Sequence, residues 1–147
     1  MARKDHHGVT EQSKASSHRR EDARVLLEEE RWRGAMYISG YVVECVLKAQ
    51  LMRKFRCATL ELLEAELVDR GMLPDDRTVY THQLIALLEL TGDAARLRQD
   101  MELWRLFNEV NRWVPAWRYT ADPADEEEAA SFLEAVDQVT TWVRNNV

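Results

Sequence analysis

The sequence has few residues that interrupt helices. It contains five glycines and three prolines in 147 residues, whereas an all-β chain needs both residue types at its frequent turns. Their scarcity therefore favours an all-α fold. The length is that of one ordinary domain, which is enough to bury a single hydrophobic core.

Cysteine is also scarce, and the two that occur are Cys45 and Cys57. Two cysteines do not provide the disulfide framework that holds many small secreted domains together. Cys45 lies in a strongly apolar segment, where a small buried thiol is expected. These features predict a reduced, intracellular protein.

Long hydrophobic runs are absent. No apolar stretch approaches the roughly 20 residues that span a membrane. The N-terminal stretch MARKDHHGVT lacks the apolar core of a secretory signal. The sequence therefore predicts a cytoplasmic protein that has no membrane partner.

An overall excess of positive charge is absent too. The chain carries 20 Lys and Arg against 26 Asp and Glu, which gives a formal net charge of −6. Nonspecific affinity for nucleic acid comes mainly from Lys and Arg that neutralise phosphates. Any contact with RNA must therefore depend on a local group of basic residues.

Several signatures of catalytic and cofactor sites are missing from the sequence. It has no Gly-rich phosphate loop and no nucleophile elbow. His6, His7 and His18 have no Cys or further His at a metal-binding spacing. We therefore expect no metal site and no cofactor.

The distribution of apolar residues predicts a flexible arm followed by one domain. Residues 1–20 contain almost no large apolar side chain, so they cannot offset the entropy of ordering and are expected to be flexible. Residues 21–147 are expected to form a single helical-bundle domain.

Within that domain, apolar residues recur every three or four positions, which is typical of amphipathic helices. The pattern predicts an up-and-down bundle of about four main helices and one or two short ones. The first expected helix begins near residue 21, and the others cover 35–55, 58–70, 82–90, 93–114 and 122–144. In the helix at 93–114, four residues are expected to face inward: Leu97, Met101, Trp104 and Phe107.

The segment GYVVECVLKAQL, residues 40–51, places Glu44 and Lys48 within an otherwise strongly apolar helix. Burial of an unpaired ionised group is costly. The two residues lie four apart with the acid first, which is the favourable order for an ion pair along one helical face. Glu44 therefore either pairs with Lys48 along the surface or turns inward as part of a site.

Three further patterns occur in a fixed order: AMYISGYVVECVLKA at 35–49, THQLIALL at 81–88 and WRYT at 117–120. Together they resemble the HEPN family, small helical-bundle proteins of prokaryotes that also occur as domains of larger proteins. The resemblance implies a HEPN-like bundle that forms a homodimer. It also implies that Glu44 reaches inward to a partner on another element, either Arg118 or His82.

HEPN members that cleave RNA carry an Arg followed a few residues later by a His. These residues meet their symmetry mates in a dimer and form a metal-independent ribonuclease site, in which the His moves a proton and the Arg stabilises charge on the phosphate. Arg77 and His82, separated by TVYT, match this spacing. The resemblance therefore implies that Arg77 and His82 are catalytic.

The sequence also departs from the pattern of these nucleases. Their motif is expected within NRWVPAWRYT, where Arg112 is followed by Trp117 and Arg118 instead of a His. In the alternative interpretation, His82 is a helix-start histidine that fixes the neighbouring loop, and Arg77 is a solvated loop residue.

The segment around Arg118 is a candidate binding site for a phosphate or a base. Arg118 lies between Trp117 and Tyr119 in the sequence. Arginines beside aromatic rings recur in sites that bind nucleotides and single-stranded nucleic acids. The candidate binding residues are Glu44, Lys48, Arg112, Arg118 and Tyr119. In the structural alternative, Arg118 pairs with Glu44 while the tryptophans cover the end of the bundle or a dimer surface.

Three functions follow from these patterns. The first is a HEPN-like toxin of an RNA-linked stress or defence system, which acts as a metal-independent ribonuclease and has a minimal nucleotidyltransferase as its antitoxin partner. The second is a noncatalytic HEPN-like module that binds a nucleotide or a protein partner. The third is an unrelated helical bundle that scaffolds an assembly, which an exposed Glu44 far from Arg118 would favour.

Overall fold

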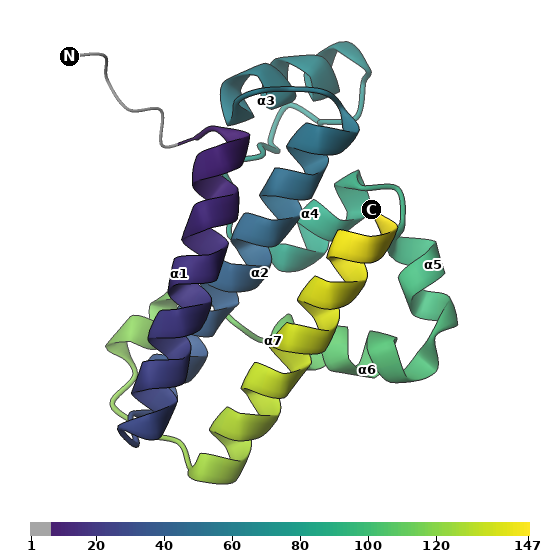
Figure 1. The fold of residues 1–147 in the computed structure, drawn as a ribbon. Helices are drawn as coiled ribbons and strands as arrows, with labels where there is room; N and C mark the ends of the chain where they lie inside the picture. The colour runs from purple at the N-terminus through teal and green to yellow at the C-terminus, as the bar shows by residue number, and fades with distance from the viewer. Residues whose placement is uncertain (1–6) are drawn as a thin grey trace, which may run out of the picture.

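The computed structural model describes residues 7–147, and its architecture is based on three long helices (Figure 1). They are α1 (Val9–Glu28), α2 (Trp32–Lys54) and α7 (Glu126–Asn146). The three lie side by side, and α1 runs antiparallel to the other two. Every residue from 42 to 52 is buried, so α2 is the central helix and a polar group on this part of it needs a partner inside the protein.

The chain between α2 and α7 forms shorter helices around this frame. They are α3 (Leu60–Asp69), α4 (Leu84–Leu90), α5 (Ala94–Gln99), α6 (Met101–Val110) and the 3-10 helix η1 (Pro115–Tyr119). Both α4 and η1 pack against α2, and α6 packs against α7. The segments that begin α4 and form η1 are therefore brought together along α2, although they are far apart in the sequence.

The all-α class predicted from the sequence is confirmed, but the helix lengths differ from the prediction. Among residues 7–147 there are three long and four short α-helices, where about four main helices were expected. The predicted helix at 93–114 is divided at Asp100, whose backbone is extended with φ −91° and ψ 101°. The Asp100 side chain accepts a hydrogen bond from Leu103 N–H and so caps a new helix. Met101 follows this break and is 85% exposed instead of facing inward.

The predicted flexible arm at residues 1–20 is wrong from Val9 onward, because α1 begins there. Residues 1–6 lie outside the described part of the chain. The prediction assumed that an ordered helix needs large apolar side chains. In the structure, the small side chain of Ser16 is only 2% exposed, and Leu26 and Leu27 pack against the core farther along the same helix.

An ion pair also connects α1 to α7. Arg20 donates hydrogen bonds of 2.6 and 2.8 Å to the two carboxylate oxygens of Asp137. A bidentate guanidinium–carboxylate pair fixes orientation as well as distance. This contact therefore adds a polar connection between α1 and α7, while α1 packs mainly against α2.

Gly40 permits a close approach between α2 and the turn after α6. The ring of Trp113 lies over Gly40, and a Cβ atom on this residue would lie 2.2 Å from three atoms of that ring. Trp113 is only 2% exposed, and its Nε1 donates a hydrogen bond of 2.8 Å to the carbonyl oxygen of Tyr37. The packing of Trp113 therefore requires glycine at position 40.

We predict that Gly40→Ala lowers the free energy of unfolding by about 3 kcal/mol, because the added methyl group displaces a buried indole ring. The loss would be measured by urea unfolding. The near-UV circular dichroism of the native state should change as well, since Trp113 loses its fixed environment.

Gly34→Ala provides the matched control in the same helix. A Cβ atom on Gly34 would make only ordinary contacts of 3.8 Å with Leu26 and Arg31. This variant should be unchanged or up to about 1 kcal/mol more stable, because alanine favours helical backbone more than glycine does. Equal stability of the two variants would contradict the account of Trp113.

Candidate functional site

Glu44 is the buried charge around which the candidate site is arranged. Its side chain is 8% exposed. One carboxylate oxygen accepts a hydrogen bond of 3.2 Å from Lys48 Nζ, and the other lies 2.5 Å from His82 Nδ1. Glu44 therefore turns inward and pairs with His82 on another element, whereas the predicted surface pair with Lys48 is wrong: the two residues do pair, but Lys48 is buried as well, with a side chain 7% exposed.

His82 connects this buried carboxylate to the surface. Its side chain is 53% exposed, and it belongs to the short segment that leads into α4. A carboxylate at Nδ1 favours the tautomer in which that nitrogen carries the proton. The other ring nitrogen, Nε2, is then unprotonated in the neutral ring and can accept a proton from a bound molecule.

The start of α4 is fixed by two further hydrogen bonds. Thr81 Oγ1 accepts one from Gln83 N–H at 3.1 Å, and Asn111 Oδ1 accepts one from Ile85 N–H at 3.1 Å. The second bond satisfies a backbone donor that the helix itself leaves free. The segment that carries His82 is therefore held by α6 as well as by α2.

A stripe on α2 carries most of the polar groups of the site. Tyr37, Tyr41, Glu44 and Lys48 follow one another at spacings of four, three and four residues, which places them on one helical face. The hydroxyl groups of Tyr37 and Tyr41 lie 3.3 Å apart. Sequence reasoning identified only the second half of this stripe, although the same spacing predicts the tyrosines.

Trp113 packs the aromatic side of the site. Its ring centroid lies 4.7 Å from that of Tyr41 and 6.4 Å from that of His82, and Tyr41 and His82 lie 6.1 Å apart. All three contacts are edge-to-face, a favoured geometry for aromatic pairs. The imidazole therefore has two aromatic neighbours in addition to the carboxylate at Nδ1.

Tyr41 is expected to act as a neutral donor. Burial raises the pKa of Tyr41 to about 12, and its hydrogen bond with Tyr37 adds to the effect. The hydroxyl group therefore stays protonated at neutral pH. It can donate a hydrogen bond to an anionic group that approaches His82.

Arg118 and Tyr119 lie on η1 beside this stripe. The Arg118 guanidinium lies 4.8 Å from the centroid of the Tyr119 ring, and Tyr119 is 77% exposed. The pKa of Arg118 is raised, first by its electrostatic interaction with Tyr119 and then by hydrogen bonds to Tyr119 and Tyr37. The structure shows no ion pair between Arg118 and Glu44, both of which are described, so of the two partners predicted for Glu44 it is His82 that makes the contact.

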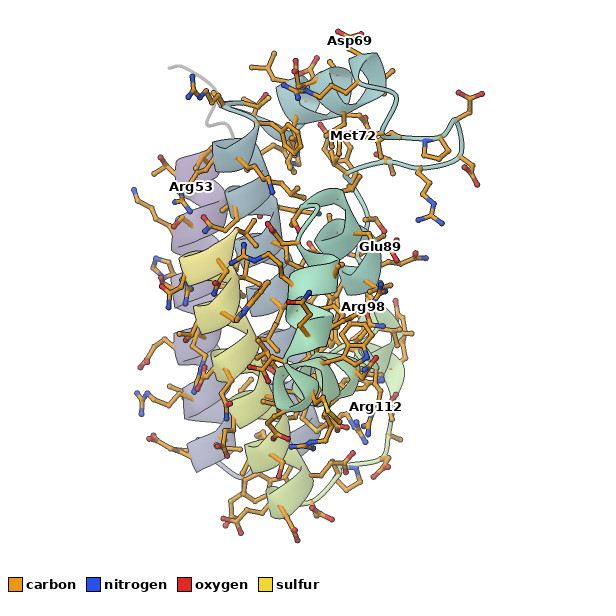
Figure 2. All side chains as sticks on the ribbon, turned by 90° about the vertical axis from the view of Figure 1, so that its right-hand side faces the viewer. Arg53, Asp69, Met72, Glu89, Arg98 and Arg112 are labelled. Atoms are coloured by element: carbon orange, nitrogen blue, oxygen red, sulfur yellow. The ribbon has the colours of Figure 1, made fainter. Side chains whose placement is uncertain are left out.

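Two other residues of the segment NRWVPAWRYT, Arg112 and Trp117, contact other parts of the protein. Arg112 forms ion pairs with Glu109 at 3.1 Å and with Glu128 at 3.6 Å, and Figure 2 shows it near the lower end of the molecule. Trp117 packs against Phe132 with ring centroids 5.5 Å apart. Arg112 is thus engaged with carboxylates, and Trp117 covers the core as the structural alternative predicted.

Arg77 and His82 match the nuclease spacing in the sequence but face different surroundings. Arg77 lines a hollow with other residues of the loop before α4 and with Ala86 and Glu89 of α4. His82 instead contacts Glu44. For these two described residues the structure shows no mutual contact, so the literal Arg–His pair is not assembled within one chain.

Two further observations on the described residues concern a metal-binding group and a membrane-spanning helix. Among residues 7–147 there is no group of three or more His, Cys, Asp or Glu side chains that can hold a metal ion. No helix in this part of the chain combines the length and the apolar character needed to cross a membrane.

Comparisons of the chain with protein-family models, with curated proteins and with solved structures find no match. The resemblance to the HEPN family therefore depends on the three sequence patterns alone.

We predict that Lys48→Met lowers the free energy of unfolding by about 3 kcal/mol, because it leaves the buried Glu44 carboxylate without its cationic partner. The double variant Glu44→Gln, Lys48→Met should recover most of this loss, since no ionised group then remains in the core. Urea unfolding of the single and double variants measures the coupling between the two positions. Strictly additive losses would show that the two side chains do not stabilise each other.

Proposed function

We propose that this protein is a metal-independent ribonuclease of HEPN-like type, in which His82 transfers protons and Arg118 binds the phosphate. The observation that carries the proposal is the contact of 2.5 Å between the buried Glu44 carboxylate and Nδ1 of the half-exposed His82. A histidine oriented by a carboxylate presents its second nitrogen in a defined direction, which is what a general acid or base requires.

The groups along the face of α2 that contacts His82 support phosphate as the ligand. Arg118 carries a positive charge on the surface of η1 and lies beside Tyr37. Tyr41 adds a neutral hydroxyl donor near His82. Charge-assisted donors of this kind stabilise the negative charge that develops on a phosphate in the transition state.

RNA suits a centre with a single histidine because RNA supplies its own nucleophile. The 2′-oxygen attacks phosphorus as its proton passes to Nε2 of His82. The bond between phosphorus and the 5′-oxygen then breaks, and the departing oxygen takes the proton back from His82. DNA lacks the 2′-hydroxyl group and should not react by this route.

The exposed ring of Tyr119 supports a single-stranded substrate. Bases stack on aromatic side chains and on arginine, and this stacking tolerates many sequences. With Arg118 stacked on it, Tyr119 can hold a base next to the phosphate. A duplex buries its bases and would not offer this contact.

The resemblance to the HEPN family supports a wider role for this activity. It points to a toxin in an RNA-linked stress or defence system, to a homodimer, and to a minimal nucleotidyltransferase as the antitoxin. In such a dimer, a second copy of the chain would bring its own His82 to the site.

We predict that the purified protein degrades total RNA in the presence of EDTA and leaves DNA intact. His82→Ala should reduce the rate at least about 100-fold, since it removes the acid/base group. Arg118→Ala should reduce it about 10-fold or more, since it removes a donor to the phosphate.

Arg105→Ala provides the charge-matched control for these variants. Arg105 is an exposed arginine on α6 that pairs with Glu102 at 2.6 Å, so its loss should leave the rate within about twofold. An inactive wild type would contradict the proposal. So would equal rates for wild type and His82→Ala when both are folded.

A noncatalytic nucleotide-binding module is the second candidate, and the exposed Arg118–Tyr119 stack favours it. In this case wild type binds a single-stranded oligonucleotide and leaves it intact. Binding would persist in His82→Ala and weaken in Arg118→Ala, as fluorescence anisotropy with a labelled RNA would show.

A further inference from the structure

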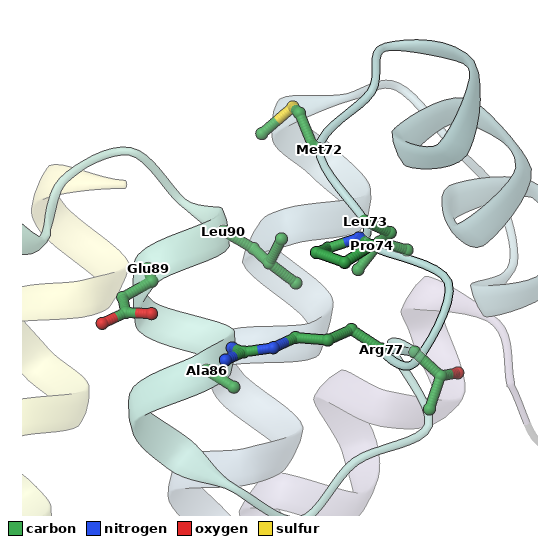
Figure 3. A pocket seen from close by; sticks show the side chains of 8 residues that line it. Met72, Leu73, Pro74, Arg77, Ala86, Glu89 and Leu90 are labelled. Carbon is green, nitrogen blue, oxygen red and sulfur yellow. The ribbon is translucent and has the colours of Figure 1, made fainter.

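A second surface feature, separate from the Glu44–His82 site, lies between α4 and the loop that follows α3. It is a hollow of about 360 Å³, which is within the size range of small-molecule sites. Most of its lining is apolar and comes from Met72, Leu73, Pro74, Ala86 and Leu90. Figure 3 shows that the loop supplies one wall and α4 supplies the other.

Arg77 places a positive charge in this apolar hollow. Its side chain crosses from the loop toward Ala86 on α4 (Figure 3). Among residues 7–147, the structure shows no ion pair and no side-chain hydrogen bond for Arg77. Its guanidinium therefore has all of its donors available to a bound molecule.

Polar groups gather on one side of Arg77. A neighbouring hollow of about 300 Å³ shares Arg77, Thr78 and Ala86 with the first and is also lined by Thr81 and Gln83. Arg77 thus stands between an apolar space and a polar one. This arrangement fits a ligand with an apolar body and a charged head.

We propose that this hollow binds small organic anions that have an apolar body and a single negative charge, of the class of medium-chain carboxylates. The apolar body fills the space between Leu73, Pro74 and Leu90, and the carboxylate pairs with Arg77. A carboxylate and a guanidinium form two parallel hydrogen bonds, which favours this head group.

Two acidic neighbours restrict the ligand to one negative charge. Glu89 lines the apolar hollow and Asp76 lines the polar one. Each lies near Arg77 without pairing with it, so both repel an anion of higher charge. Phosphomonoesters and nucleotides should therefore bind here much more weakly than a monocarboxylate.

This site is independent of the proposed ribonuclease. None of Tyr37, Tyr41, Glu44, His82 or Arg118 lines the hollow. The binding test below therefore fails or succeeds whatever the outcome of the RNA assay.

We predict that octanoate binds to the ¹⁵N-labelled protein and shifts the backbone amide signals of residues 72–78 and 86–90. Octylammonium has the same apolar body with the opposite charge, and acetate has the head group without the body. Each should bind at least about 10-fold more weakly than octanoate. Arg77→Gln should weaken octanoate binding by a similar factor, whereas Arg105→Gln should leave it unchanged.

A second variant tests the apolar part of the site. Ala86→Trp fills the hollow and should abolish the octanoate shifts. If that variant fails to fold, Arg77→Gln still decides the question, because Arg77 is exposed and has no partner to lose. Three results would each overturn the proposal. The first is that octanoate shifts only signals outside residues 72–78 and 86–90. The second is that octylammonium binds as tightly as octanoate, and the third is that Arg77→Gln leaves the affinity for octanoate unchanged.

Discussion

A buried carboxylate is the constraint on which the rest of this structure depends. Glu44 lies in a part of α2 where every residue from 42 to 52 is buried, and an ionised group is tolerated there only with partners. Lys48 supplies one partner from the next turn of the same helix, and His82 supplies the other from the segment before α4. The interaction that satisfies Glu44 therefore also positions a half-exposed imidazole at the surface.

The same helix determines what surrounds that imidazole. Tyr37 and Tyr41 continue the face of Glu44 toward the N-terminus of α2, and Gly40 leaves room for Trp113 to pack against them. Because these groups come from one rigid helix and from segments held against it, their relative positions do not depend on a mobile loop. Arg118 adds a surface charge to this fixed arrangement. The combination of an oriented histidine, hydroxyl donors and a cation is what makes a phosphate site chemically reasonable.

The sequence predicted the central helix well, because apolar residues on every face of 35–55 indicate burial on all sides. It missed the beginning of α1, where Ser16 packs closely without a hydrophobic signal. Local spacing also predicted the pair of Glu44 and Lys48, and the HEPN resemblance suggested His82. The spacing did not determine whether His82 or Arg118 reaches Glu44, since that depends on the course of the loops. For the same reason it paired Arg77 with His82, although the folded chain gives each a different environment.

The proposed role of His82 depends most directly on the hydrogen bond between Glu44 and Nδ1 of His82. Long-range ¹H–¹⁵N correlation spectra of the imidazole ring distinguish the two neutral tautomers. The structure predicts that His82 carries its proton on Nδ1 in wild type and that Glu44→Leu, which removes the acceptor, shifts the ring toward the Nε2-protonated form that free histidine prefers. A ring protonated on Nε2 in wild type, with no change in Glu44→Leu, would show that Glu44 does not orient His82.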